Sequence, residues 1–312
     1  MTELKPAKRS RNLDLKAFVL LTVLCASWGF QQVTIKIANQ GVSPVLQSGI
    51  RSVCAAILVW IWMAERREPM LEKDGTLWWG IAIGLLFAGE FVFIYLGLNY
   101  TNASRAVIFL YSSPFIVALG SQFFIPGEHL EKIQVIGLCC AFTGIIIAFK
   151  ESLTSPTYKM LIGDGMLAIA AVLWGSVTVM IKASPLVRIA PSKTLLYQLG
   201  VSAIVLPVGS LFMGEPGVVL MTPLIAVCLV YQAVWVAFIT YLVWFWLIRN
   251  YPVSRIASFT FLTPIFGVLA GGLLLNENIS NSLLLALVLV GTGIYLVNRP
   301  DINYNLRRLN IE

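Results

Sequence analysis

The sequence predicts an all-α membrane protein whose ten transmembrane helices form two inverted-topology repeats of five. The first observation is composition: 58% of the residues are hydrophobic and 12% are charged, against about 25% charged in a soluble domain. The second is an internal repeat. A Trp-Gly pair begins at Trp28 and again at Trp174, and a lysine follows at Lys36 and at Lys182, so both landmarks recur after 146 residues. Such repetition predicts two similar halves.

Long apolar stretches supply the predicted spans. A helix needs about 20 apolar residues to cross a bilayer. Charge-free runs such as Ala17–Ile35 and Pro216–Ile248 are close to this length or longer. Strands of a transmembrane barrel would alternate polar and apolar residues, and these runs do not. The helices expected in the first half are 16–37, 43–64, 76–99, 104–125 and 131–149. Those expected in the second half are 162–183, 190–213, 222–248, 253–275 and 280–298.

The remaining segments are short and polar. They are a basic N-terminus (1–15), a periplasmic linker (150–161) and a C-terminal tail (300–312), which leave the repeats at 16–149 and 162–299. Three prolines, Pro114, Pro207 and Pro264, fall well inside spans, where they are expected to kink or locally open the helix.

Orientation follows from lysine and arginine. Because five spans is an odd number, the second repeat must enter the membrane from the opposite side. Most basic residues then lie on the side of the chain ends, which places both termini in the cytoplasm and the protein in the inner (cytoplasmic) membrane. The net charge of +7 is explained by orientation, so the expected partners are the lipid bilayer and a small molecule, without nucleic acid.

Enzymatic chemistry is not expected. The chain has one histidine, His129, and it has no phosphate-binding glycine-rich loop, metal-spaced cluster or nucleophile elbow. The five cysteines fall inside apolar spans without CxxC spacing, which is typical of small packed hydrophobes. No catalytic residue, cofactor or metal site is therefore predicted.

Two charges lie deep within predicted spans. A charge at such depth, as at Arg51 and Glu90, costs at least about 2.5–3.5 kcal/mol unless it faces water, a partner or a ligand. One interpretation is a mutual ion pair that only holds helices together. A second is that Arg51 receives a substrate carboxylate or that Glu90 takes up a proton. A third is that one of them reaches toward the interface.

Polar and aromatic residues share helical faces with these charges. In the first span Trp28, Gln32 and Lys36 are four residues apart, and the sixth span repeats this pattern. One interpretation is that these faces are walls of a cavity, with each lysine near one of its mouths. The other is that each lysine lies at the membrane interface with its stem in lipid. The repeated members are Trp174, Thr178 and Lys182.

Further aromatic candidates are Tyr111, Tyr231 and Trp235. The default interpretation is packing against lipid or hydrogen bonding between helices. If the face that carries Tyr231 and Trp235 points inward, it would instead form an amphipathic cage for a small organic solute.

The order of these motifs resembles the EamA repeat of the drug/metabolite transporter superfamily over nearly residues 16–299. The motifs are the Trp-Gly pair and later lysine of each first span, Gly49-Ile50-Arg51, Ser104 to Pro114, Gly127-Glu128 and Thr143-Gly144. The resemblance implies ten helices, cytoplasmic termini and export of amino acids or related metabolites. Two departures are that Arg105 stands where such repeats often have a small or apolar residue, and that Gln198 replaces the basic counterpart of Arg51.

The resulting expectation is a carrier that exports a small polar or zwitterionic metabolite, such as an amino acid, by alternating access. The first four helices of each half would rock around a midplane cavity, while the fifth and tenth brace the periphery or a homodimer contact. Proton or counter-solute coupling, import of a metabolite or nucleotide-linked solute, and a sensor or assembly protein without turnover remain alternatives. The substrate-binding residues predicted are Trp28, Gln32, Lys36, Arg51, Glu90, Tyr111, Trp174, Thr178, Tyr231 and Trp235.

Overall fold

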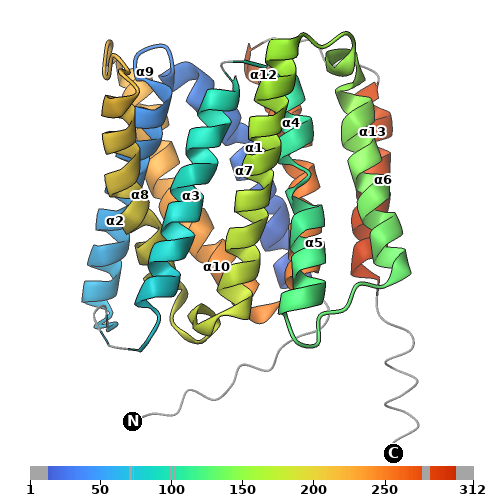
Figure 1. The fold of residues 1–312 in the computed structure, drawn as a ribbon, viewed down its shortest axis with the longest axis horizontal. Helices are drawn as coiled ribbons and strands as arrows, with labels where there is room; N and C mark the ends of the chain where they lie inside the picture. Colours follow the sequence, from blue (N-terminus) through green and yellow to red (C-terminus); the bar gives the residue numbers. More distant parts are fainter. Residues whose placement is uncertain are drawn as a thin grey trace, which may run out of the picture.

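A computed structural model of the chain describes residues 13–69, 72, 74–98, 100–101, 103–275 and 282–299. The predicted tails 1–15 and 300–312 lie almost wholly outside these residues. The first half contains α1 (Leu15–Ala38), α2 (Pro44–Glu65), α3 (Leu77–Leu98), α4 (Ala103–Leu110), α5 (Ser113–Phe124) and α6 (Lys132–Ala148) (Figure 1). A 3₁₀ turn, Lys150–Leu153, follows.

The second half repeats this order. It contains α7 (Tyr158–Ala183), α8 (Pro191–Phe212), α9 (Pro223–Val230), α10 (Tyr241–Asn250), α11 (Val253–Ser258), α12 (Leu262–Leu275) and α13 (Ser282–Asn298). Between them lie the 3₁₀ turns Pro185–Arg188 and Phe259–Phe261 and the π-helix Tyr231–Thr240, which is continuous with α9 and α10.

Caps and prolines set where these helices begin. The Asp14 side chain accepts a hydrogen bond from the Ala17 N–H at 2.8 Å, and Thr157 caps α7 in the same way. Two of the three internal prolines interrupt their spans as predicted. Pro114 stands in the first turn of α5 and Pro264 in that of α12, directly after breaks in the helix, because proline lacks the N–H that would continue it.

Pro207 does not open its helix locally: α8 continues through it. Its ring lies against α2, where a Cβ on Gly49 would be only 2.8 Å from the Pro207 Cγ atom. The absence of a side chain at Gly49 therefore allows α2 and α8 to approach closely.

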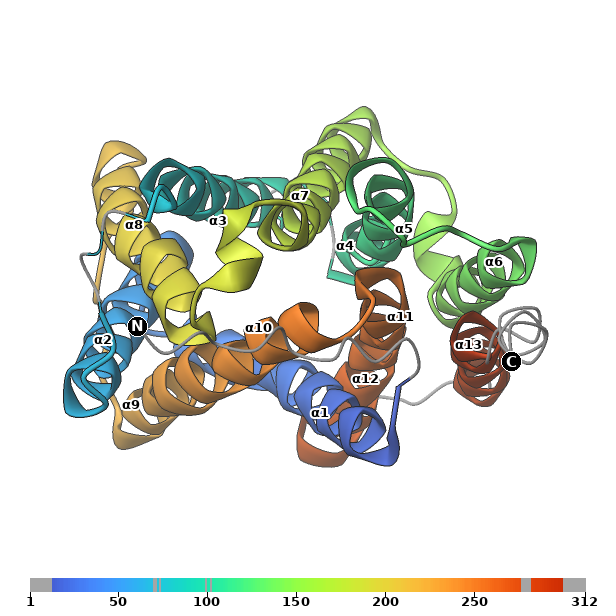
Figure 2. The same ribbon diagram turned by 90° about the horizontal axis from the view of Figure 1, so that it is seen from below.

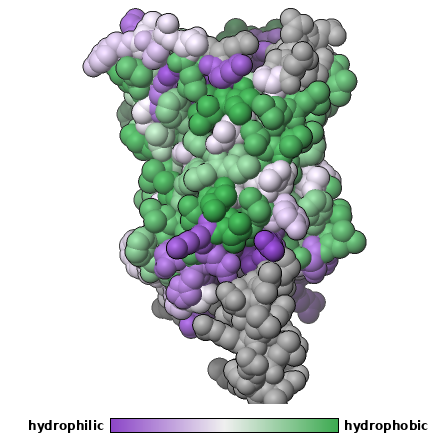
Figure 3. Space-filling view, turned by 90° about the vertical axis from the view of Figure 1, so that its right-hand side faces the viewer, coloured by the Kyte–Doolittle hydropathy of each residue, from purple (hydrophilic) through white to green (hydrophobic). Residues whose placement is uncertain are grey.

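The helices are long and apolar enough to cross a bilayer. Eight spans among the described residues meet this criterion, and two shorter apolar helices, Lys132–Ala148 and Leu284–Asn298, accompany them. On the face seen in the space-filling view, hydrophobic residues cover the middle, and hydrophilic residues gather toward the two ends (Figure 3). The protein is a multi-pass membrane protein with the predicted ten-helix fold.

The two halves are inverted relative to each other. We call the end that holds Asp14 and Arg299, both lining one surface recess, the termini side, and the opposite end the far side. The Tyr251 hydroxyl donates to Asp14 at the start of α1, whereas its backbone carbonyl accepts from Lys182 at the end of α7. Since one residue meets the start of α1 and the end of α7, the first helices of the two halves run in opposite directions.

Each side of the bundle combines helices from both halves (Figure 2). On one side α3, α4 and α5 pack on α7, and α3 also packs on α8; on the other side α1 packs on α9 and α12, and α2 packs on the π-helix. The pairs α2–α8 and α6–α13 complete the bundle. The sequence repeats are therefore not the packing units.

Candidate functional site

A cavity lies between the two sides and is enclosed by α1, α2, α3, α4, α7, α8 and α10. Its empty volume, counted up to the open mouth, is about 1000 Å³. Seven of the ten predicted binding residues line it: Trp28, Gln32, Arg51, Glu90, Tyr111, Trp174 and Thr178. Charged, amide and aromatic side chains thus meet in one chamber within the membrane-spanning part of the molecule.

Arg51 supplies the positive charge of this chamber. Only 2% of its surface is exposed, its guanidinium carbon lies 4.4 Å from the centroid of the Phe91 ring, and one terminal nitrogen donates to Ser48 Oγ at 3.3 Å. The Nε atom has no hydrogen-bond partner. Because a buried donor without a partner is costly, this atom is suited to an acceptor brought by a ligand.

Gln198 on α8 adds a second unsatisfied polar group. It lines the same cavity, and its side-chain oxygen is buried without a hydrogen-bond partner. In the sequence, Gln198 was noted only because it stands where the second half was expected to have a basic residue equivalent to Arg51. The structure places it in the chamber with Arg51, where its amide offers both a donor and an acceptor.

Glu90 supplies a negative charge. It is 7% exposed and lines the cavity from α3. Both Arg51 and Glu90 are described residues, and no nitrogen–oxygen distance of 4.0 Å or less joins their charged groups. The mutual ion pair, one of the interpretations of these two charges, is not formed in this structure. Both charged residues line the chamber.

Aromatic rings form much of the wall. The indole of Trp28 lies edge-on to Trp244, with ring centroids 5.4 Å apart, and its N–H donates to Thr240 Oγ1 at 2.8 Å. Across the cavity, Tyr111 and Trp174 make a similar edge-on pair at 5.6 Å. These contacts fix the ring orientations and leave an apolar surface beside the charged groups.

The chamber opens toward the far side and is sealed toward the termini side. Its exposed lining residues, Gln32 and the 36%-exposed Leu98, lie in the far-side parts of α1 and α3. At the other end Lys182, 4% exposed, donates from α7 to the Ile248 and Tyr251 carbonyls at 2.5 and 2.8 Å. These carbonyls end α10, where the helix dipole favours a cation. The contact joins the two sides of the bundle.

The structure does not bring the other three predicted residues into the cavity. Lys36 is exposed near the far-side end of α1. Tyr231 and Trp235 face α1 outside the chamber, where they donate to the Ser27 carbonyl and hydroxyl at 3.0 and 2.9 Å. They lie in the π-helix, which turns less per residue than an α-helix, so α-helical spacing does not assign their face.

Other lining residues were not selected from the sequence. They include Gln31, Phe87, Phe91, Tyr95, Tyr241 and Trp244. Tyr241 and Trp244 follow Tyr231 and Trp235 in the same predicted span, for which packing against lipid was the default interpretation. Among the residues that the structure describes, no cluster of three His, Cys, Asp or Glu side chains could hold a metal ion.

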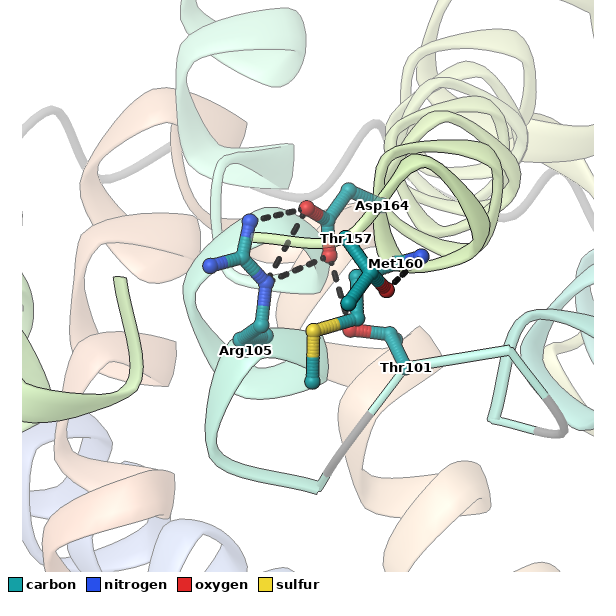
Figure 4. A network of polar contacts seen from close by, with 5 residues as sticks. All are labelled: Thr101, Arg105, Thr157, Met160 and Asp164. Atoms are coloured by element: carbon teal, nitrogen blue, oxygen red, sulfur yellow. Dashed lines mark hydrogen bonds and ion pairs between the residues drawn. The ribbon is translucent and has the colours of Figure 1, made fainter. Parts of the chain in front are cut away.

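A buried ion pair joins α4 and α7 (Figure 4). Arg105 on α4 contacts both carboxylate oxygens of Asp164 on α7, including two 3.1 Å bonds from its Nε, and Thr101 donates to the same carboxylate at 2.9 Å. Both charged side chains are at most 4% exposed. The residue that departs from the family pattern, Arg105, therefore ties two helices of the same side together.

Comparisons with known proteins agree with this architecture. The model of the "EamA-like transporter family" matches residues 15–150 and 161–299. A "Probable amino-acid metabolite efflux pump" of Escherichia coli is 26% identical over 91% of this chain and 95% of its own length. An "Uncharacterized transporter YoaV" of Bacillus subtilis is 24% identical over 86% of this chain and 92% of its own.

Solved structures show the same fold. One, titled "Crystal structure of protein", superimposes with a TM-score of 0.79 at 17% identity and covers 93% of this chain and 99% of its own.

Proposed function

Because this chain belongs to the EamA-like transporter family, we propose that it exports a small zwitterionic metabolite, an amino acid or a related compound. Export would proceed from the cytoplasm across the cytoplasmic membrane. The protein is a membrane transporter and not an enzyme. The excess of lysine and arginine on the termini side supports placing both chain ends in the cytoplasm. The chamber would then open outward in this structure.

The observation that carries the proposal is the buried Arg51 with its unpartnered Nε. A carboxylate is the ligand that best satisfies a guanidinium in an apolar site, because charge-assisted hydrogen bonds are about twice as strong as neutral ones. Gln198 can donate to the same group through its amide, and Glu90 offers an acceptor for an ammonium. The aromatic walls suit the apolar part of the solute.

Alternating access requires that the termini side open as well. The contacts that would have to break are those from Lys182 to the end of α10, since they join the two sides. The moving units would be the two mixed sides of the bundle, in place of the first four helices of each half. The solute would then enter from the termini side and leave through the mouth marked by Gln32 and Leu98.

Transport in proteoliposomes tests the proposal. Purified protein should give saturable flux of labelled amino acids, and Arg51→Ala should reduce the rate at low solute concentration by about 10- to 100-fold, the factor for a lost hydrogen bond to a charge. Arg51→Lys, which keeps the charge, should retain part of the flux. Lys159→Gln, on the exposed start of α7, is the matched control with normal flux.

Two results would overturn the proposal. If the protein binds amino acids but shows no flux in either direction, it is a sensor and not a carrier. If flux is saturable but Arg51→Ala leaves it unchanged, the chamber residues do not bind the carboxylate.

A further inference from the structure

A second recess lies on the termini side, on the face of α10 opposite to the chamber. Trp244 and Phe245 line the chamber, whereas Leu242, Val243 and Trp246 line the recess. The recess also contacts the start of α1, the end of α2 and the start of α8, and it contains about 810 Å³ of empty space up to its mouth. It is therefore a separate site.

Two cations are held at this recess by indole rings. The Lys16 ammonium lies 4.9 Å from the centroid of Trp246, and the Arg66 guanidinium lies 4.0 Å from that of Trp62. Such cation–π contacts favour conformations in which the charged groups stay over the recess. Lys16 is the second residue of α1 and Arg66 directly follows α2, so both lie at the depth where helices end.

Among the residues that the structure describes, one carboxylate lines the recess, and it is already engaged. Glu68 accepts a short hydrogen bond from the Ser192 hydroxyl at the start of α8. The positive end of the helix dipole at this position further offsets its charge. Lys16 and Arg66 are exposed, and together with Glu68 they give the lining of the recess a net positive formal charge.

The walls beneath the cations are apolar. Leu20, Leu242 and Val243 line the recess at least one helical turn deeper than Lys16 or Arg66. A cationic rim at the membrane surface above an apolar wall matches an anionic, amphipathic ligand. The chain's own N-terminus does not match, because it carries the same charge through Lys5, Lys8 and Arg9.

We propose that this recess binds an anionic phospholipid from the leaflet on the termini side. The phosphate would lie between Lys16 and Arg66, and the acyl chains would follow the wall formed by Leu20, Leu242 and Val243. The same site places the lipid against α10, whose opposite face forms the transport chamber.

Titration of the full-length protein in detergent with dioctanoyl phosphatidylglycerol tests this proposal. The lipid should raise the thermal midpoint, whereas dioctanoyl phosphatidylcholine should not. The double variant Lys16→Gln/Arg66→Gln should bind phosphatidylglycerol about 30-fold more weakly, since each cation near an anionic lipid contributes roughly a factor of five. The matched control is Lys132→Gln/Arg188→Gln, which removes the same charge from exposed positions on the same side.

A second variant covers the case in which the double variant unfolds. Leu242→Trp fills the recess without changing its charge, and it should also weaken phosphatidylglycerol binding. The proposal is overturned if phosphatidylglycerol acts no better than phosphatidylcholine, or if the recess variants and the control bind it equally. Inorganic phosphate provides the third arm: stabilisation by phosphate alone that disappears in the double variant would indicate a site for a free anion and not for a lipid.

Discussion

The two ends of the bundle carry equivalent lysines in different surroundings. Lys36 in the first half is exposed on the far side, one residue beyond Ile35 of the chamber wall. Lys182 in the second half is buried on the termini side and donates to backbone carbonyls at the end of α10. The repeats are inverted, so each lysine belongs to one end. The difference shows that the same Trp-Gly and lysine motif can lie at an open end of the chamber in one half and at a closed end in the other.

Two aspartates near the starts of α1 and α7 repeat this contrast. Asp164 is buried and paired with Arg105 on the far side. Asp14 is exposed on the termini side, where the Ala17 N–H and the Tyr251 hydroxyl hydrogen-bond it and lower the pKa of its carboxyl. Asp164 connects α7 to α4 of the other half, and Asp14 connects the start of α1 to Tyr251 at the end of α10, but only Asp164 is buried.

The largest expected effect therefore comes from the buried pair. Removing one partner of a buried ion pair costs about 3–5 kcal/mol, because the other charge stays buried and uncompensated. We expect Asp164→Ala to lower the thermal midpoint in detergent strongly. The matched variant Asp14→Ala should lower it much less, since its carboxylate is solvated. Equal losses at the two positions would contradict the contrast between the ends.

The seal on the termini side should respond next. Lys182→Met removes hydrogen bonds from a charged group, each of which contributes about 1.5–3 kcal/mol, so the opening equilibrium should shift by at least about tenfold. The measurement uses the Thr178→Cys variant of a protein that lacks its native cysteines. The readout is the rate at which a membrane-impermeant maleimide labels this variant from the termini side. Labelling should be faster after Lys182→Met.

The control for this measurement is Lys36→Met. Because Lys36 lies at the other end, its substitution should not increase labelling from the termini side. If both variants label at the same rate, Lys182 is not the seal.

A smaller effect is expected from acid on the termini side. Burial works to raise the pKa of Asp74, but hydrogen bonds from Lys193 and Thr76 outweigh it and lower the pKa from 3.8 to about 2. A lowered folded-state pKa stabilises the protein above pH 4 and loses that contribution as the pH falls toward 2. The thermal midpoint of wild type should therefore fall more steeply than that of Asp74→Asn between pH 4 and 2. Parallel curves would show that the pair contributes nothing.

Much of the fold was predictable because lipid restricts the choices. A span in hydrocarbon must satisfy its own backbone, so apolar length alone indicates helices, and the repeat fixes their number in each half. Helix breaks near Pro114 and Pro264 followed from the missing proline N–H. Pro207 does not break α8, and its ring packs closely against Gly49 of the neighbouring α2.

The site was most predictable at charges within spans and on the Trp-to-Lys face that both halves repeat, which placed Trp28 and Trp174 in the chamber. Arg51 and Glu90 could be selected because a charge in lipid is expensive, and both line the chamber. Aromatic residues carry no such penalty, so the sequence could not separate Trp244, in the chamber wall, from Trp235, which packs on α1. Their faces depend on the phase change that the π-helix introduces between them.

The sequence by itself determined that this protein spans the membrane as two repeats, because burial of apolar length is a local property of the chain. Only the tertiary structure decided that each side of the chamber combines helices from both halves, and that Lys182 is buried while Lys36 is exposed. Those features depend on contacts between residues far apart in the chain, such as Lys182 with Tyr251, and similar motifs can occupy either state.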